Sequence, residues 1–298
     1  MDLRPTTFDE IIGQANTKEC LKIAIDSACR RNDVLGHSIF LGPPGTGKTT
    51  LARATASKLN AKIYLANGGS IKNVKDVLPY LSRLARGDVL FIDEVHRVHT
   101  RVQEALFTVM EDFRLDVSKG ALSISIKPFT LLGATTEAGM LLRPFYDRFI
   151  HQLTLEDYSM DELCKMLVVN CQKINIAAED SAIRSIAMRA RYTPRIANSI
   201  LQFCRDYTLV KTNSNVHVPT ISDSVVREAM DLKKIDEKGL DETDRRYIMV
   251  LKAAGKPMGL NTLVGVTRLS RETIEHQIEP YLLRLGIIEK TTKGRKLV

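Results

Sequence analysis

The chain has 298 residues, 44% of them hydrophobic, which allows two or three domains with sizeable cores and excludes a disordered chain. No stretch approaches the roughly 18 consecutive apolar residues of a membrane span, and the N-terminus lacks the basic start and apolar core of a signal peptide, so we expect a cytoplasmic protein that contacts no membrane. The formal charge of +8 favours polyanionic partners, and the five cysteines lack the spacing of a disulfide framework or a zinc site.

A glycine-rich loop lies between a predicted strand and a predicted helix near the start of the chain. The run IFLGPPGTGKTTL (39–51) contains the full G-x-x-x-x-G-K-T pattern, preceded by an apolar strand and followed by a helical stretch. In this pattern backbone N–H groups close around phosphates, the lysine reaches the β- and γ-phosphates, and the threonine hydroxyl binds Mg²⁺. We therefore expect ATP, or a close relative, and Mg²⁺ to bind through Gly42, Gly45, Thr46, Gly47, Lys48, Thr49 and Thr50.

Two carboxylates end an apolar strand about forty residues further on, in the run DVLFIDE (88–94). The first, Asp93, can hold Mg²⁺ through water, and the second, Glu94, can polarise a water for in-line attack on the γ-phosphate. An isolated run of this kind is more typical of a strand that ends at the surface, but its position downstream of a phosphate loop favours nucleotide hydrolysis.

The strand signal divides the chain into modules. Strand-like runs alternate with helical stretches from about 8 to 149, which predicts a mostly parallel sheet covered by helices; from 160 to 231 only helical periodicity remains. A polar stretch at 233–241 is typical of a linker, and helical patterning resumes after it before a strand-like run and a basic tail. We place an α/β nucleotide-binding domain at 1–152, an all-α domain at 153–234 and a third module at 235–298.

Ten segments of the chain resemble a known family. They are LRPTTFDEIIGQ (3–14), FLGPPGTGKTTLA (40–52), GDVLFIDEVHRV (87–98), MEDFRLD (110–116), PFTLLGATTEAG (128–139), DRF (147–149), TPRIAN (193–198), GLDETDRRY (239–247), TIEHQIEPYLLRLGII (273–288) and KGRK (293–296). Together they resemble the AAA+ ATPases and, within them, the RuvB Holliday-junction branch-migration motors of bacteria. The phosphate loop and the two carboxylates mark only the superfamily, whereas His96-Arg97, MEDFRLD, TPRIAN and IEPYLL are signatures of RuvB.

The resemblance implies a fold and several roles that spacing alone does not supply. The fold is an AAA+ core, a small all-α lid and a C-terminal winged helix, assembled as a homohexameric ring. Thr136 would be sensor 1, Arg148 an arginine finger given to the neighbouring subunit, and Arg195 sensor 2. Without the resemblance, Arg148 would be a solvated surface residue and Arg195 part of a salt bridge. The segments that surround the adenine in the family include Leu3, Arg4, Ile11, Ile12, Tyr158 and Pro194, whose apolar members are typical core residues by periodicity.

The C-terminal segment has the character of a duplex-DNA module. The resemblance implies a winged helix with helices near 242–253, 261–267 and 272–285, followed by a wing whose tight turn Gly294 permits. From residue 284 onward five basic residues stand against one acid. We expect Lys293, Arg295 and Lys296 to meet phosphates, which positions a protein on DNA without reading its sequence. A basic tail alone is more typical of a solvated chain end.

The chain departs from the family at three places. Between MEDFRLD and PFTLLG the family carries a longer β-hairpin that docks onto the partner RuvA, whereas here only residues 117–127 are present, with the alternation of a hairpin strand around Ile124. We expect docking to RuvA to be altered or lost. Near the finger, Tyr146 replaces an arginine, so no alternative finger lies two residues before Arg148. Glu137 stands where an arginine is common, a change for which there is no physical account.

The resemblance implies a function that combines these sites. We expect an ATPase of the helicase type that drives branch migration of Holliday junctions in homologous recombination and DNA repair, in the cytoplasm near the nucleoid, with a RuvA-type protein and a RuvC-type resolvase as partners on double-stranded DNA. One alternative is a clamp-loader-like AAA+ switch that remodels a protein partner on DNA. Another is a non-enzymatic DNA-binding assembly whose ATP site only stabilises a ring, which the complete set Lys48, Thr49, Asp93, Glu94 and Arg148 disfavours.

Overall fold

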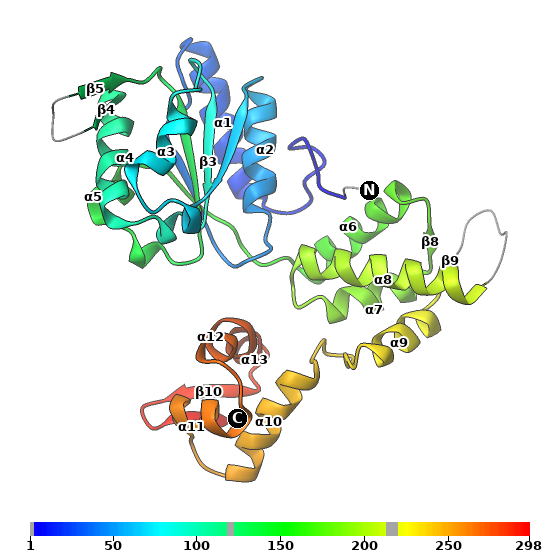
Figure 1. Ribbon diagram of the computed structural model, residues 1–298. Helices are drawn as coiled ribbons and strands as arrows, with labels where there is room; N and C mark the ends of the chain where they lie inside the picture. Colours follow the sequence, from blue (N-terminus) through cyan, green and yellow to red (C-terminus); the bar gives the residue numbers. More distant parts are fainter. Residues whose placement is uncertain (1–2, 118–121, 213–219) are drawn as a thin grey trace. The chain divides into compact units, whose positions relative to one another are not determined.

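The computed structural model describes residues 3–117, 122–212 and 220–298, which form two compact units, Met1–Glu162 and Leu163–Val298 (Figure 1). Among the helices of the described residues, none has the length and apolar character that crossing a membrane requires.

The first unit is built around a five-stranded sheet in which every pairing is parallel, as the alternating sequence pattern predicts. The strand order is β2-β3-β6-β1-β7. The strands are β1 (Ser38–Leu41), β2 (Ile63–Asn67), β3 (Val89–Asp93), β6 (Thr130–Thr135) and β7 (His151–Thr154). Because neighbouring strands are parallel, all their carboxyl ends lie at one edge, where ligands of such sheets bind.

Helices cover both faces of this sheet (Figure 1). On one face, alternate strand residues such as Phe40 and Phe91 pack against α1 (Ala15–Arg30) and α2 (Lys48–Lys58). On the other face, Ile39 and Leu90 pack against α3 (Val74–Leu81) and α4 (Thr100–Asp112). A sheet that is buried on both faces needs strands with continuous apolar runs, and the central strands β1, β3 and β6 have such runs. The smaller elements are η1 (Gly68–Ser70), η2 (Val95–Arg97), η3 (Ala138–Met140) and α5 (Arg143–Asp147).

The short hairpin predicted from the sequence is present. Its strands β4 (Arg114–Val117) and β5 (Leu122–Ser125) pair antiparallel, with Leu115 opposite Ile124. The tip of the predicted hairpin, residues 118–121, lies outside the described residues.

The second unit begins with a helical module. Its helices are α6 (Met160–Lys173), which starts at the end of the first unit, α7 (Asp180–Arg189), α8 (Pro194–Thr212) and α9 (Asp223–Leu232), in agreement with the predicted helical periodicity. The sequence pattern missed one feature, a parallel pair of two-residue strands, β8 (Ala177–Ala178) and β9 (Thr220–Ile221). Strands this short carry too few residues for an alternation to be recognised.

The C-terminal module of this unit contains helices followed by a two-stranded wing. Its elements are α10 (Glu242–Ala254), α11 (Leu260–Thr267), α12 (Arg271–Thr273), the π-helical turn η4 (Ile274–Ile278), α13 (Glu279–Arg284), β10 (Ile288–Thr291) and β11 (Gly294–Leu297). The third predicted helix is therefore interrupted by a wide turn directly before Pro280, which lacks an N–H for a regular helix. Gly294, predicted to permit the tight turn of the wing, has a positive φ of 129°.

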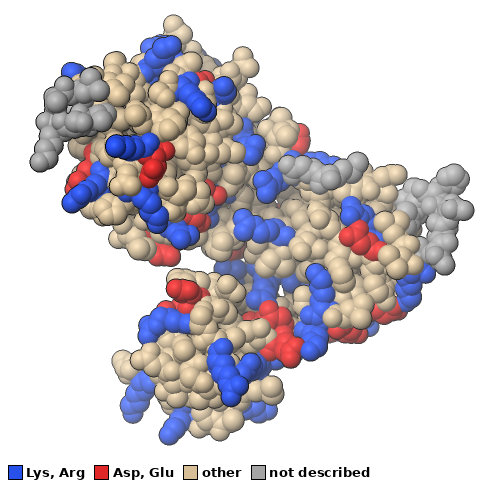
Figure 2. Space-filling view, in the orientation of Figure 1, with Lys and Arg blue, Asp and Glu red and all other residues tan. Residues whose placement is uncertain are grey.

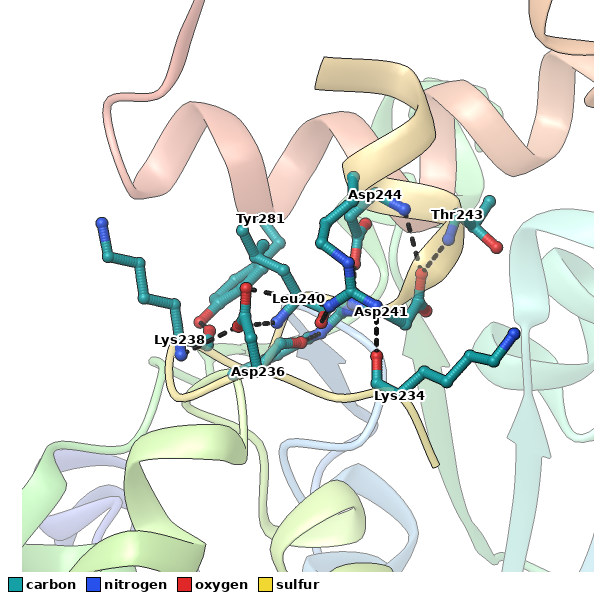
Figure 3. Close-up of polar contacts among 11 residues, drawn as sticks. Lys234, Asp236, Lys238, Leu240, Asp241, Thr243, Asp244 and Tyr281 are labelled. Atoms are coloured by element: carbon teal, nitrogen blue, oxygen red, sulfur yellow. Dashed lines mark hydrogen bonds and ion pairs between the residues drawn. The ribbon is translucent and has the colours of Figure 1, made fainter. Parts of the chain in front are cut away.

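The stretch between these two modules, predicted as a linker, is a fixed turn. The carboxylate of Asp236 accepts hydrogen bonds from the backbone N–H groups of Lys238 and Leu240 at 2.9 and 2.8 Å, and Tyr281 donates its hydroxyl to the carbonyl of Lys238 at 2.6 Å (Figure 3). The polar composition that suggests a loose linker is used instead to satisfy the backbone of the turn.

A buried ion pair joins the same turn to the preceding helical module. The guanidinium of Arg191 donates to the carbonyl of Gly239 at 2.9 Å, pairs with Asp244 and lies 4.9 Å from the ring centre of Tyr281. Only 1% of the Asp244 side chain is exposed, and its carboxylate also accepts from the backbone N–H of Asp241. Removing one partner of such a pair would leave a buried charge uncompensated, so this contact fixes the start of α10.

We expect Gly239→Ala to destabilise the protein more than Gly255→Ala. Both glycines have positive φ, 73° and 61°, so each substitution carries a backbone strain of about 1–2 kcal/mol. A Cβ on Gly239 would also lie 2.6 Å from the carbonyl oxygen of Arg189, whereas a Cβ on Gly255 meets nothing within 4 Å. Urea unfolding followed by circular dichroism measures the difference. An equal loss of unfolding free energy in the two variants would mean that the backbone near Gly239 shifts to accommodate the added Cβ.

Candidate active site and wing

The phosphate loop between β1 and α2 has the backbone of an anion cradle. Gly42, Gly45 and Gly47 all have positive φ, at 138°, 81° and 104°. A Cβ on Gly42 would lie 2.5 Å from the carbonyl oxygen of Leu155, so only glycine fits at this position. The loop leads into the N-terminus of α2, where the backbone N–H groups of the first turn and the helix dipole favour an anion.

Side chains within the loop hold its shape. The ammonium group of Lys48 donates to the carbonyls of Gly42 and Pro43, both at 2.8 Å, and the hydroxyl of Thr46 donates to the carbonyl of Pro43 at 2.8 Å. Thr46 and Lys48 are buried, at 1% and 6% exposure. The predicted phosphate-binding lysine thus lies inside the curve of the loop, where its charge fits a bound phosphate.

The structure brings the two predicted Mg²⁺ ligands together. The hydroxyl of Thr49 lies 3.3 Å from Oδ2 of Asp93, although 44 residues separate them in sequence. Among the described residues, no group of three His, Cys, Asp or Glu side chains could hold a metal by itself. This donor set fits Mg²⁺, which binds through one or two protein oxygens together with substrate phosphates and water.

Glu94 follows Asp93 in a strained conformation. Its φ of 50° places it in the left-handed region, which is uncommon for a residue other than glycine. Its carbonyl packs against Gly68, where an added Cβ would lie only 2.2 Å from that oxygen. Backbone strain of this kind persists where the surrounding structure holds it, and it often marks a functional site.

His96 is a site residue that the sequence patterns did not assign. Its ring lies between Glu94 and Thr135, the last residue of β6, and its side chain is only 7% exposed. The predicted sensor Thr136 is the next residue and is exposed, so its role stays a prediction. Thr135 is buried at 1% whereas its neighbour is exposed, and because every residue of β6 is buried, no alternation in the sequence could have separated the two threonines.

Arg148 lies directly after α5 and contacts its own chain. Its guanidinium pairs with Glu111 at 2.6 Å and lies 4.6 Å from the ring centre of Phe107, yet 38% of the side chain is exposed. A half-exposed ion pair contributes little free energy, so this contact can exchange for a stronger one at small cost. The finger role in a neighbouring subunit stays a prediction.

The residues expected around the adenine belong to both units. In the first unit Leu3, Ile11 and Tyr158 are buried, Ile12 is partly buried and Arg4 is exposed. Burial raises the pKa of the Tyr158 hydroxyl to about 12, so it stays neutral. In the second unit Pro194 begins α8 and Arg195 is exposed in its first turn.

The wing of the second unit is anchored by a buried carboxylate. Glu279 at the start of α13 has no exposed surface, and it accepts hydrogen bonds from Arg295 at 2.7 Å and from Tyr247 at 2.9 Å, with Lys290 at 2.7 Å. Burial opposes ionisation, but these donors outweigh it and hold the pKa of Glu279 below its ordinary value. Arg295 also lies 3.5 Å from Glu275. The phosphate contact predicted for Arg295 remains a prediction, but its charge already has an internal partner.

The other basic residues of the wing face solvent more openly. Lys293 is exposed, and no ion pair joins it to another described residue. Lys296 pairs with Glu289 at 2.6 Å, with about half of each side chain exposed, which is a weak contact. Lys and Arg side chains stand out on the visible surface of this module (Figure 2). Lys293 and Lys296 are therefore placed to meet phosphates, and their DNA contacts remain predictions.

The parallel sheet, the glycine cradle and the paired Thr49 and Asp93 define a P-loop nucleotide-binding protein. Family models match almost the whole chain: "Holliday junction DNA helicase RuvB P-loop domain" over 3–155, "RuvB AAA lid domain" over 158–236 and "RuvB C-terminal winged helix domain" over 237–298. The chain belongs to the RuvB family of AAA+ P-loop ATPases.

Individual relatives agree with this assignment. The chain is 43% identical over 301 residues to the Holliday junction branch migration complex subunit RuvB of Rhodopirellula baltica, covering 98% of this chain and 81% of that protein. Identity to the RuvB subunit of Campylobacter hominis is 41%, covering 98% and 87%. The solved Thermotoga maritima RuvB Holliday junction branch migration motor superposes with a TM-score of 0.88 at 38% identity, covering 99% and 95%. These findings confirm the predicted family and do not favour the clamp-loader alternative.

We expect Arg295→Ala and Lys293→Ala to have different effects. Arg295→Ala leaves Glu279 short of a donor and lowers the free energy of unfolding by about 1–3 kcal/mol. Lys293→Ala leaves stability unchanged and weakens binding to duplexes of any sequence, since a phosphate contact carries no sequence information. Urea unfolding and a salt titration of DNA binding measure the two effects.

The matched control is Lys296→Ala, which removes an exposed pair and changes stability by less than about 1 kcal/mol. Full stability of Arg295→Ala combined with weakened DNA binding would make Arg295 a phosphate ligand rather than an anchor.

Proposed function

We propose that this chain is an ATP-hydrolysing motor that drives branch migration of Holliday junctions in homologous recombination and repair. One observation carries the proposal. The same chain contains a phosphate loop with Lys48, the paired Thr49 and Asp93, and a RuvB-type winged helix. A protein that only bound ATP would not need Glu94 held in a strained backbone beside the predicted Mg²⁺ ligands. The names of the relatives add the junction as substrate.

Each site residue receives a role in this proposal. Lys48 and the loop glycines bind the phosphates of ATP, Thr49 and Asp93 hold Mg²⁺, and Glu94 orients the attacking water. In a homohexameric ring Arg148 reaches the site of the neighbouring subunit, and Thr136 and Arg195 respond to the γ-phosphate. The adenine is surrounded by Leu3, Arg4, Ile11, Ile12, Tyr158 and Pro194. The nucleotide-binding domain spans 1–152, the lid 153–234 and the winged helix 235–298.

The partners are double-stranded DNA, a RuvA-type junction-binding protein and a RuvC-type resolvase, and the motor acts in the cytoplasm at the nucleoid. The positive formal charge of +8 and the exposed Lys293 support contact with DNA. The winged helix would hold the duplex through its phosphates, which suits a helicase-type motor that moves along any sequence.

We expect the wild-type chain to dissociate a synthetic four-way DNA junction in an ATP-dependent way and Glu94→Gln to lose this activity. The glutamine cannot accept a proton from the attacking water, so turnover falls about 10²-fold or more while ATP binding persists. Gel analysis of the junction and a phosphate-release assay measure both.

Glu104→Gln is the matched control because it removes an equal charge from an exposed position on α4. We expect it to behave like the wild type. ATP turnover without junction dissociation, with and without a RuvA-type protein, would instead support a switch that remodels a protein partner.

We also expect weak binding to a standard RuvA-type protein, because β4 and β5 are joined through only residues 118–121. A variant in which this segment is lengthened by about six residues, toward the longer hairpin that the family resemblance implies, should bind a RuvA-type protein more tightly in a pull-down. Equal binding by the two chains would show that the short hairpin docks normally.

A further inference from the structure

His96 connects two functional strands. It lies in η2, directly after the two carboxylates at the end of β3. Its Nδ1 atom lies 2.8 Å from Oγ1 of Thr135, and its Nε2 atom lies 3.5 Å from Oε2 of Glu94. With 7% of the side chain exposed, the ring has little room for another orientation. The imidazole therefore bridges the Glu94 carboxylate and the end of β6.

The contacts around the ring favour one tautomer, which is an assignment from the hydrogen-bond network. Oγ1 of Thr135 accepts from the backbone N–H of Glu137 at 2.9 Å, and its own hydrogen can be donated to Nδ1 of His96. With Nδ1 as the acceptor, the ring N–H is on Nε2 and faces the carboxylate of Glu94. The other tautomer would place a nitrogen lone pair against the negative oxygen. The chain of donors thus runs from Glu137 through Thr135 and His96 to Glu94.

Glu94 needs such a support. Its backbone is fixed by the contact with Gly68, but 31% of its side chain is exposed. Within the part of the chain that the structure describes, His96 is the one residue with a polar contact to the Glu94 carboxylate. A carboxylate with several side-chain torsions loses efficiency as a base when its orientation is not held.

We propose that His96 is a positioning residue for ATP hydrolysis: its Nε2–H holds the Glu94 carboxylate in an orientation set by the end of β6. The proposal rests on the hydrolytic function proposed above. Because Thr135 precedes Thr136 in the chain, a displacement of this strand end reaches Glu94 through the imidazole ring. His96 thereby connects the predicted sensor strand with the residue that activates water.

Two amide substitutions separate the contacts of the ring. In His96→Asn the amide lies as many bonds from the backbone as Nδ1, so it keeps the contact with Thr135 and loses Glu94. In His96→Gln the amide extends as far as Nε2 and keeps a donor to Glu94. We expect His96→Asn to lower kcat for ATP about tenfold or more with KM for ATP unchanged, and His96→Gln, which loses only the contact with Thr135, to lower kcat less. Equal losses of kcat in the two variants, or a wild-type kcat in His96→Asn, would overturn the proposal.

His99→Asn is the matched control. His99 lies three residues further on, is exposed, and accepts a hydrogen bond from the backbone N–H of Arg101, which asparagine can replace at a helix start. We expect wild-type kcat and melting temperature in this variant. A loss in His99→Asn equal to that in His96→Asn would mean that any change in this segment lowers turnover, against the proposal.

A double-mutant cycle decides between positioning and mere packing, even where a single variant melts early. If His96 acts through Glu94, adding His96→Asn to Glu94→Gln lowers the residual rate no further. A further loss of the same size as in the single variant would overturn the proposal. The Glu94→Gln arm also tests the proposed function separately: wild-type turnover in Glu94→Gln would overturn both, whereas a strong loss there with a wild-type His96→Asn overturns the positioning role alone.

Discussion

The parallel pairing of β3, β6 and β1 is the constraint on which the nucleotide site depends. Leu41 lies opposite Thr135 in one pair, and Ile92 lies opposite Gly133 in the next. Both faces of these strands are packed in the core, so a slip of one residue would exchange the side chains of the two faces and disrupt the packing of both, and the register is strongly specified. With the register fixed, the phosphate loop, the two carboxylates and the hydroxyl of Thr135 all leave the sheet at one edge.

Close backbone contacts then complete this edge. Gly42 packs against the carbonyl of Leu155 and Gly68 against that of Glu94, in both cases closer than a Cβ would allow. The sheet supplies these contacts from packed strands and turns, so the positive φ of Glu94 is held by its surroundings. The burial of the surrounding core offsets the backbone strain at Glu94. The Glu94 carboxylate is therefore attached to a backbone that has little freedom to move.

Local signals explain how much could be predicted from the sequence. The phosphate loop and the run that ends in Asp93-Glu94 are contiguous, and each strand and long helix has its own periodicity, so short windows were sufficient. His96 was not assigned because its partner Thr135 is 39 residues away in the sequence. Asp236 was taken as part of a linker because its carboxylate accepts hydrogen bonds within a turn that also contacts the distant Tyr281. The π-helical turn before Pro280 likewise depends on packing. Contacts of this kind need the tertiary structure.

The wing shows why a count of charges is a poor guide to an interface. Five basic residues from Arg284 onward suggest a strong phosphate-binding surface, but Lys290 and Arg295 both contact the buried Glu279. A cation that neutralises an internal carboxylate releases fewer counterions when DNA binds, because its charge is already compensated. The salt dependence of DNA binding should therefore reflect fewer phosphates than the five basic residues would neutralise. The same internal pairs hold β10 and β11 on α13, so part of the positive charge of the wing stabilises its own fold, and the phosphate contacts proposed for Lys293 and Lys296 involve the lysines that do not contact Glu279.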